Sequence, residues 1–358
     1  MSEVGSAEIP DSCRAIVFDP QGRSLESREL PMRPIGPGEV LVRVSLSAIC
    51  GSDLHTIRGR RDPGGPLVLG HEICGTVAAL SEDGAADFHG EPLSIGDRVT
   101  WSIAASCGRC LHCGRGIPQK CLHLFKYGHE TLASDTPLSG GFAEYCYLAP
   151  GTAIFRLPGD IPDSTAVFAN CSLATMQAAV RMAEVLPGDS VLIQGAGTVC
   201  LCAAALAAHR GAGSVVVVDP CEERLDVARR FGGSETVSEV SGAGRFDVAI
   251  EACGAPQVVA TGIEALRIGG RYILAGCVFP GATAEVDLQA ITTKLLRIEG
   301  LHNYTPLDLH EALRFLHDAR GRFAFDEVVR EVFALEEIDA ALGLMESDPS
   351  VLRAALMP

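Results

Sequence analysis

The sequence has little positive charge and no long apolar run, and both deficits narrow the classes of protein to consider. Its 29 Lys and Arg residues face 45 Asp and Glu residues, which gives a formal net charge of −16. Nucleic acids and anionic membrane surfaces attract basic proteins, so this composition argues against both as partners. No apolar run approaches the roughly 18–20 residues of a membrane-spanning helix, and the first residues lack the charged-then-apolar pattern of a secretory signal. We therefore expect a cytoplasmic protein.

The sequence contains fourteen cysteines, and they are not expected to form disulfides. Without a secretory signal, reduced thiols and metal ligation are expected rather than a disulfide framework. The length of 358 residues also exceeds what one hydrophobic core usually serves, so the sequence predicts two domains.

The rhythm of the sequence changes near residue 160. Before it, short β segments alternate with Gly and Pro, which is typical of a mostly β domain with functional loops. After it, helical segments alternate with continuous apolar strands, as a parallel sheet covered on both faces requires. The sequence thus predicts an α/β protein in which residues 1–160 and 304–358 form one domain and residues 161–303 a doubly wound parallel sheet. The final segment, two helices with a strand between them, is expected to pack on the first domain.

Four cysteines within fifteen residues, at C-x2-C-x2-C-x7-C spacing, predict a tetrahedral metal site. They are Cys107, Cys110, Cys113 and Cys121. Four thiolates close the coordination sphere of zinc, which indicates a structural site. The alternative is an iron–sulfur cluster, but the bacterial ferredoxin pattern places its fourth cysteine after three residues and before proline. Here seven residues intervene and Leu122 follows, so zinc is favoured.

A glycine turn between a strand and a helix predicts a dinucleotide site. Gly195 and Gly197 follow the apolar strand SVLIQ and open a helix, where a bare backbone lets a pyrophosphate approach the helix N-terminus. Cys200 replaces the third glycine of the usual fingerprint, which would loosen strand–helix packing unless the thiol fits. Asp219 ends the next strand, where its carboxylate can hydrogen-bond ribose hydroxyls and would repel a 2′-phosphate, so NAD is favoured over NADP. The predicted cofactor contacts are Gly195, Gly197, Thr198, Val199 and Asp219.

A second group of metal-ligating side chains is spread over three segments. Cys50 lies in CGSDLH, His71 in GHE and Cys171 in NCSLAT, and each segment alone is a weak signal. Together they offer two thiolates and one imidazole, a set that holds zinc and leaves one coordination position open. The alternative is that both cysteines are ordinary buried residues, as expected for most of the remaining eight.

These motifs, in this order, resemble those of the zinc-containing alcohol dehydrogenases of the medium-chain dehydrogenase/reductase family over nearly the whole chain. The resemblance implies a GroES-like catalytic domain with a structural zinc lobe at 104–124, and a Rossmann domain that binds NAD. It implies two zinc ions per chain, with Cys50, His71 and Cys171 as ligands of the catalytic ion, a donor set already known from alcohol dehydrogenase. It also implies a homodimer or a homotetramer.

The resemblance further assigns roles around the catalytic zinc. Glu72 is implied either as a transient zinc ligand or as an electrostatic neighbour, and Asp53 as the carboxylate that orients His71. Ser52 and His55 match the proton relay of the family, which carries the proton of the alcohol to solvent through the nicotinamide ribose. The implied activity is hydride transfer between NAD and a small alcohol or its aldehyde or ketone.

A looser resemblance concerns the substrate. The segments PQKC, FKYGHE, LSGGFAEY, VFPG and GLHNY resemble a subgroup associated with phosphonate catabolism, which implies an alcohol bearing a phosphonate group. Arginine suits such a group because its planar fork binds phosphonate oxygens in bidentate fashion. The candidate anion-binding residues are Arg58, Arg60, Arg61, Lys126 and His129. The alternative is that these are solvated loop charges.

Other functions remain open from the sequence. Within the same family, a polyol, sugar or cyclitol dehydrogenase would bind vicinal hydroxyls in place of an anion. An electron-transfer protein with an iron–sulfur cluster and a redox-inactive nucleotide-binding protein are alternatives from different classes.

Overall fold

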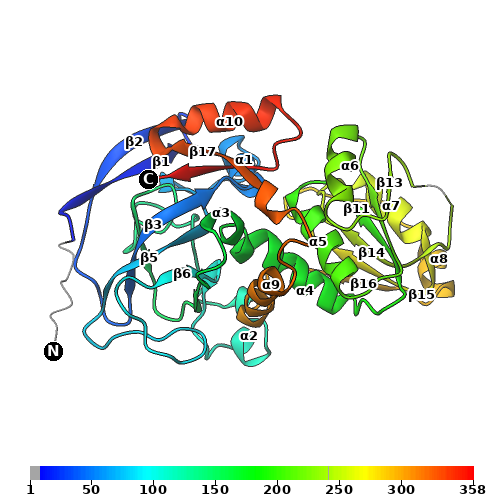
Figure 1. Cartoon of the computed structure of the whole chain (residues 1–358), viewed down its shortest axis with the longest axis horizontal. Coiled ribbons are helices and arrows are strands. Elements are labelled where there is room, and N and C mark those ends of the chain that lie inside the picture. The colour runs from blue at the N-terminus through cyan, green and yellow to red at the C-terminus, as the bar shows by residue number, and fades with distance from the viewer. Residues whose placement is uncertain (1–8, 241) are drawn as a thin grey trace. The chain divides into compact units, whose positions relative to one another are not determined.

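The computed structural model describes residues 9–240 and 242–358, which form two compact units (Figure 1). The first unit contains the described chain from residue 9 up to Cys171, together with Val329–Ser347 and Arg353–Pro358. The second contains Ser172–Val328 and Asp348–Leu352. Each unit has its own sheet system and buried apolar core, as expected of separate domains.

The first unit is built mostly of β-strands. Its largest sheet has the strand order β10-β6-β5-β3-β18-β17, with β9 also paired to β3, and smaller sheets have the orders β2-β1-β4 and β7-β8. The strands are β1 Ser12–Asp19, β2 Ser24–Pro31, β3 Val40–Ala48, β4 Leu67–Val68, β5 Glu72–Leu80, β6 Arg98–Trp101, β7 Ala104–Ala105, β8 Phe125–Lys126, β9 Tyr145–Leu148, β10 Ile154–Arg156, β17 Val329–Ala334 and β18 Arg353–Met357. The helices are α1 Gly51–Ile57, α2 Leu111–Gly114, α3 Asp163–Ala166 and α10 Ile338–Ser347.

The last strand, β18, lies between β3 and β17, a position that the sequence did not predict. It runs parallel to β17 and antiparallel to β3, with Ala355 opposite Ala48 and Leu356 opposite Ser47. Its residues are buried up to Leu356, so its one charged side chain, that of Arg353, is buried too. Because the pairing is antiparallel, Arg353 lies beyond the end of β3, next to the segment that carries Cys50.

The second unit is a doubly wound parallel sheet, which confirms the predicted fold class. Its order is β13-β12-β11-β14-β15-β16, and every pairing is parallel. The strands are β11 Ser190–Gln194, β12 Ser214–Val218, β13 Glu235–Val237, β14 Phe246–Glu251, β15 Leu266–Leu274 and β16 Arg297–Gly300. The helices are α4 Ala174–Met182, α5 Thr198–His209, α6 Glu222–Arg229, α7 Gln257–Glu264, α8 Leu288–Thr293 and α9 Pro306–Asp318. The strand order reverses at β11, where ligands of such sheets usually bind.

The unit boundaries differ from the predicted ones at residues 160 and 304. The first unit extends to Cys171, and helix α9 belongs to the second unit rather than to the first. Helix α9 buries an apolar face there, with Phe315 packed against His209 at the end of α5. In addition, the Arg181 side chain on α4 donates to both carboxylate oxygens of Asp308 on α9, at 2.8 and 3.1 Å. Asp308 is buried and also caps α9 by accepting from the backbone N–H and the hydroxyl of Thr305. Of the segments after residue 303, only β17, α10 and β18 return to the first unit.

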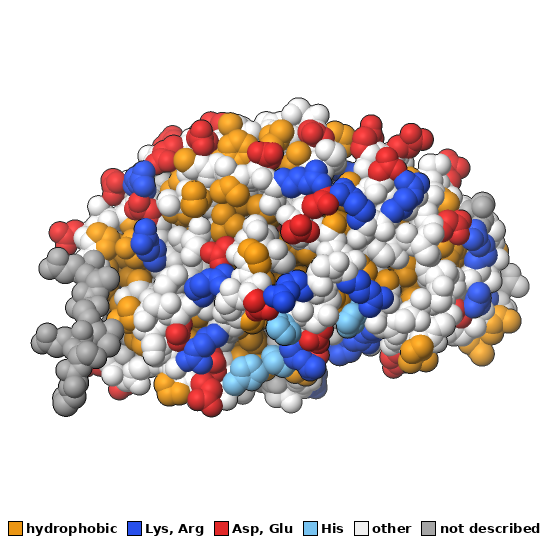
Figure 2. All heavy atoms as spheres, viewed as in Figure 1, with side chains coloured by type: hydrophobic (Ala, Val, Ile, Leu, Met, Phe, Trp, Pro, Cys, Tyr) orange, Lys and Arg blue, Asp and Glu red, His pale blue; other side chains and the backbone are white. Residues whose placement is uncertain are grey.

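The surface carries charges of both signs. Acidic and basic side chains are interspersed on the face shown in Figure 2, and several arginines pair with exposed carboxylates, as Arg58 does with Glu346 and Arg297 with Glu184. Such exposed pairs contribute about 0–1 kcal/mol each. Within residues 9–240 and 242–358, no helix has the length and apolar character needed to cross a membrane.

Candidate active site

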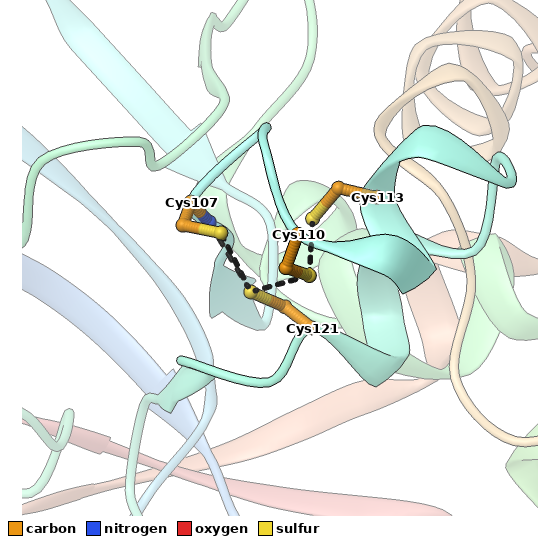
Figure 3. A group of neighbouring side chains, drawn as sticks. All are labelled: Cys107, Cys110, Cys113 and Cys121. Carbon is orange, nitrogen blue, oxygen red and sulfur yellow. Dashed lines mark hydrogen bonds between the residues drawn. The ribbon is translucent and has the colours of Figure 1, made fainter.

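The four clustered cysteines converge on one point (Figure 3). Cys110 precedes α2, Cys113 lies in α2, and Cys121 follows a 3-10 turn at Pro118–Lys120. The sulfur of Cys121 lies 3.5 Å from that of Cys107 and 3.8 Å from that of Cys110. All four sulfurs lie within 4.8 Å of one another, as a single tetrahedral ion requires.

The backbone around these cysteines is arranged to stabilise thiolates. The N–H groups of Cys107 and His123 donate to the Cys121 sulfur at 3.3 Å, and that of Leu122 donates to the Cys110 sulfur at 3.5 Å. Backbone hydrogen bonds lower the pKa of Cys110 to about 5. Four thiolates with no further donor fit zinc in a closed structural site, as predicted.

A second group of donors, Cys50, His71 and Cys171, lies in the first unit and also converges within 4.8 Å. Cys50 precedes α1, and His71 stands between Gly70 and the start of β5. Gly70 has φ +90°, and a Cβ there would lie 2.6 Å from the Phe142 ring, so this sharp approach to His71 needs glycine.

The third donor, Cys171, sits in a π-helical turn, Ala169–Leu173, just before α4. The neighbouring Asn170 side chain is buried and donates to the backbone carbonyls of His71 and Trp101, at 3.1 Å each. Asn170 thereby ties the turn that carries Cys171 to the loop that carries His71. This role of Asn170 was not predicted from the sequence, because an asparagine beside a cysteine carries no signal of its own.

The charges in this group suit a bound cation. The hydrogen bond from Cys171 lowers the pKa of Cys50 well below its usual range, and the positive charges of Arg353 and His71 act in the same direction. Burial lowers the pKa of His71, but the charges of Asp53 and Cys50 outweigh it and raise that pKa to about 10. The two sulfurs and the ring nitrogen share protons, and a divalent ion that binds there can displace them. These donors fit zinc with one coordination position left open.

Asp53 orients two of the three donors. One carboxylate oxygen lies 3.2 Å from Nδ1 of His71, and the other accepts from the backbone N–H of Cys50 at 2.9 Å. Since the carboxylate accepts the Nδ1 proton, Nε2 of His71 is left as the metal-binding nitrogen. The contact that the family resemblance implied for Asp53 is therefore present in the structure.

Glu72 makes a buried ion pair that sequence analysis missed. Its Oε2 accepts from Nε of Arg353 at 2.9 Å, and Nη2 of Arg353 also lies 3.7 Å from the Cys50 sulfur. Glu72 is fully buried, and burial raises its pKa. Among the described residues, Glu72 is not part of the group whose ligand atoms converge within 4.8 Å. As found, it is an electrostatic neighbour of the ligands, held by Arg353.

The predicted relay residues, Ser52 and His55, lie on α1, three positions apart and hence on one face. Nη1 of Arg61 donates to the Ser52 hydroxyl at 3.0 Å, and a nitrogen of Arg60 lies 3.4 Å from Nδ1 of His55. Burial, followed by the positive charges of Arg60 and Arg61, lowers the pKa of His55.

The candidate anion-binding residues separate into two groups. Arg61 and His129 hydrogen-bond each other at 3.0 Å, and the His129 ring centre lies 5.7 Å from that of His71. Lys126 is close enough to Arg61 and Cys171 for their charges to affect it. Arg58, in contrast, pairs with Glu346 on the surface, and Arg60 approaches Nδ1 of His55. Arg61, Lys126 and His129 are therefore near the metal donors, whereas Arg58 is committed elsewhere.

The glycine turn is built as predicted in the second unit. Gly195 has φ +108°, and Gly197 caps α5 with no atom within 4 Å of where its Cβ would stand. A Cβ on Gly195 would lie 2.7 Å from the Cys200 sulfur, so the thiol fills the space that Gly195 leaves. Cys200 is buried and does not loosen the packing.

Asp219 closes this turn from the neighbouring strand. One of its carboxylate oxygens accepts from the N–H of Ala196 at 2.8 Å and the other from that of Cys221 at 2.9 Å. The Thr198 hydroxyl donates to the carbonyl of Leu352 at 3.0 Å. The turn is thus held in shape without any side chain over Gly197, which leaves room for a pyrophosphate.

Comparison with known proteins agrees with this site. The alcohol dehydrogenase GroES-like domain matches residues 36–159, and the zinc-binding dehydrogenase domain matches residues 198–318. The L-threonine 3-dehydrogenase of Streptomyces avermitilis is 33% identical over 347 residues, which cover 92% of this chain and 95% of the relative. The chain belongs to the zinc-binding alcohol dehydrogenase family.

Solved structures show the same fold over nearly the whole chain. An alcohol dehydrogenase from Thermotoga maritima has a TM-score of 0.89 at 26% identity and covers 97% of this chain and 99% of its own. Structures of an alcohol dehydrogenase from Escherichia coli CFT073 with NADH and of a zinc-binding dehydrogenase from Sinorhizobium meliloti 1021 with NADP have TM-scores of 0.84 and 0.83. Each is 25% identical and covers 98% of this chain and 100% of its own.

These findings confirm the predicted family and reaction class. The protein is a zinc-dependent oxidoreductase of the alcohol dehydrogenase type, with a GroES-like domain, a Rossmann domain and a nicotinamide dinucleotide as cofactor. Cys50, His71 and Cys171 form the site where zinc would act as a Lewis acid on a substrate hydroxyl.

Replacing Cys107 by serine is expected to remove the structural zinc. Zinc content, measured by inductively coupled plasma mass spectrometry, should fall from two ions to one per chain. Loss of about 2 kcal/mol of metal-linked stability should lower Tm by roughly 4–8 °C in differential scanning calorimetry. Cys221→Ser, which lies outside both clusters, is the control and should keep two ions. Retention of both ions by Cys107→Ser would contradict the assignment.

Replacing Arg353 by methionine is expected to destabilise the first unit strongly, because it leaves the buried Glu72 charge without its partner. The expected loss is roughly 3–5 kcal/mol, seen as a lower urea midpoint. Adding Glu72→Gln should recover part of this loss. Arg297→Met, which breaks an exposed pair, is the control and should change stability by less than about 1 kcal/mol. A double variant no more stable than Arg353→Met alone would refute the coupling.

Proposed function

We propose that this dehydrogenase transfers hydride between NAD and a small alcohol that carries an anionic group, with a phosphonate as the best candidate for that group. The observation that supports alcohol oxidation most directly is the set of three converging donors, Cys50, His71 and Cys171, which leaves zinc one position for a hydroxyl oxygen. Two thiolates and one imidazole with an open position are the ligands of a catalytic rather than a structural zinc.

Ser52 and His55 serve as the proton path in this proposal. The alcohol must lose its hydroxyl proton as hydride leaves its carbon, so a nearby group has to accept that proton. Ser52 lies two residues after the ligand Cys50, on α1, and His55 follows on the same face. The lowered pKa of His55 keeps its imidazole neutral near pH 7, in the form that accepts a proton.

The preference for NAD over NADP rests on Asp219. Its carboxylate is fixed at the end of β12 by the N–H groups of Ala196 and Cys221. A fixed negative charge at this strand end suits two ribose hydroxyls and opposes a 2′-phosphate.

The anionic group of the substrate is inferred from unpaired positive charge near the metal donors. In the described part of the chain, neither Arg61 nor Lys126 makes an ion pair with a carboxylate, although acidic residues outnumber basic ones 45 to 29. Burial and the neighbouring Arg61 charge lower the pKa of Lys126 to about 8. An anion bound there would relieve this repulsion and hold Lys126 protonated. A phosphonate oxygen would give the Lys126 ammonium the anionic acceptor that no carboxylate supplies there.

The homodimer or homotetramer suggested by the family resemblance stays a prediction.

Replacing Cys50 by alanine is expected to abolish turnover with NAD while leaving NAD binding largely intact, because Cys50 is in the first unit and the dinucleotide turn in the second. Steady-state kinetics with a panel of alcohols and NAD or NADP, together with NAD titration calorimetry, measure both properties. Zinc content should fall from two ions to one. Dehydrogenase activity surviving in Cys50→Ala would refute the ligand assignment.

Replacing Lys126 by alanine is expected to raise KM for a phosphonate alcohol roughly 10-fold or more, since a hydrogen bond to a charged group contributes about 1.5–3 kcal/mol. KM for a neutral alcohol of similar size should change little. Arg58→Ala is the matched control, because Arg58 pairs with Glu346, and it should alter neither KM. Equal effects of Lys126→Ala on both substrates would argue against an anionic substrate and favour a neutral alcohol or polyol.

A further inference from the structure

The hydrogen bonds around Ser52 have only one consistent set of directions. Nδ1 of His129 lies 2.9 Å from the carbonyl oxygen of Tyr127. A carbonyl only accepts, so Nδ1 carries the proton and Nε2 of His129 presents a lone pair. Nη1 of Arg61 lies 3.0 Å from that Nε2 and 3.0 Å from the Ser52 oxygen. Since a guanidinium only donates, the two hydrogens of Nη1 go one to His129 and one to Ser52.

These directions determine what the Ser52 hydroxyl can still do. A serine hydroxyl has two lone pairs and one hydrogen. Arg61 uses one lone pair, so one lone pair and the hydrogen remain. A serine that passes a proton on needs both of these, the first to accept the proton of the substrate and the second to donate its own. Without the Arg61 contact, the hydroxyl is free to rotate and to donate in unproductive directions.

We propose that Arg61 is a positioning residue of the proton path: it fixes the Ser52 hydroxyl in the orientation that accepts from the substrate, and neutral His129 fixes Arg61. This inference rests on the proposed dehydrogenase function. It adds a specific series of hydrogen bonds that runs from Tyr127 through His129 and Arg61 to Ser52. Burial, followed by the nearby Lys126 charge, holds the pKa of His129 well below its usual range, which agrees with its role as a neutral acceptor.

The test uses a neutral alcohol as substrate, so that any contact between Arg61 and an anionic group plays no part. Arg61→Gln in the full-length, zinc-loaded enzyme should lower kcat about 10-fold, a small share of the roughly 10²–10⁴-fold that positioned proton transfer contributes. KM for the neutral alcohol should change less than about 2-fold, because no binding contact is lost. Arg61→Lys, which keeps a donor, should recover part of the loss, and Arg58→Gln should behave as wild type.

A coupling measurement separates positioning from a general structural effect. In a Ser52→Ala background, Arg61→Gln should cause no further loss of kcat, because its effect passes through the Ser52 hydroxyl. His129→Gln retains an acceptor for Arg61 and should keep most of the activity, whereas His129→Phe should resemble Arg61→Gln. These variants also test the proposal if Arg61→Gln folds poorly.

A readout without turnover completes the test. Binding of trifluoroethanol, an alcohol that resists oxidation, in the presence of NAD should release a proton, followed by stopped flow with a pH indicator. Arg61→Gln should slow this release. Unchanged kcat and proton release in Arg61→Gln, or an undiminished loss in the Ser52→Ala background, would overturn the inference. A wild-type enzyme inactive with NAD and every alcohol would instead refute the proposed function itself.

Discussion

The site depends on one buried carboxylate, that of Asp53. Cys50 and His71 come from different segments of the chain, and Asp53 contacts both, through the backbone N–H of the first and Nδ1 of the second. The same carboxylate approaches the N–H of Gly70 at 3.4 Å, in the turn that presents His71. One anion thus sets the position of a thiolate and the tautomer of an imidazole, and Asn170 anchors the third donor to the same loop. Without these contacts, only the free energy of metal binding would hold the three donors together.

Buried charge explains why a metal belongs here. Two thiols, the Glu72 carboxylate and the Asp53 carboxylate lie within one buried region, opposed by His71 and Arg353. Burial of unpaired charge is strongly unfavourable, so the ligands reach their ionised forms together only when a cation is added. This argues against a redox-inactive nucleotide-binding protein, which has no physical need for an open-sided metal site. The buried Glu72 carboxylate also explains why Arg353 is buried, because Arg353 supplies the opposite charge that offsets the cost of burying Glu72.

The features that could be predicted from the sequence are those encoded by residues close together in the chain. The four-cysteine lobe, the glycine turn with Asp219 and the parallel sheet each follow from short-range patterns, and the structure shows all of them. The contacts missed are those between distant segments, because Arg353 meets Glu72 across 281 residues and nothing in a lone arginine near the C-terminus marks it. The unit bounds differ from the predicted ones for the same reason, since the contacts of α9 with the second unit join distant segments, as the Arg181–Asp308 pair does across 127 residues.

The two unpaired cations near the metal donors take separate roles because their hydrogen bonds differ. Both hydrogens of Arg61 Nη1 are engaged, by Ser52 and His129, and these contacts would have to break for that nitrogen to turn toward a substrate anion. The Lys126 side chain makes no such contact in the described structure, and burial, followed by the neighbouring Arg61 charge, lowers its pKa to about 8. Lys126 is therefore the cation that an anionic substrate would stabilise most. Specificity for the substrate and passage of its proton then depend on neighbouring but distinct side chains, so either can change while the other is kept.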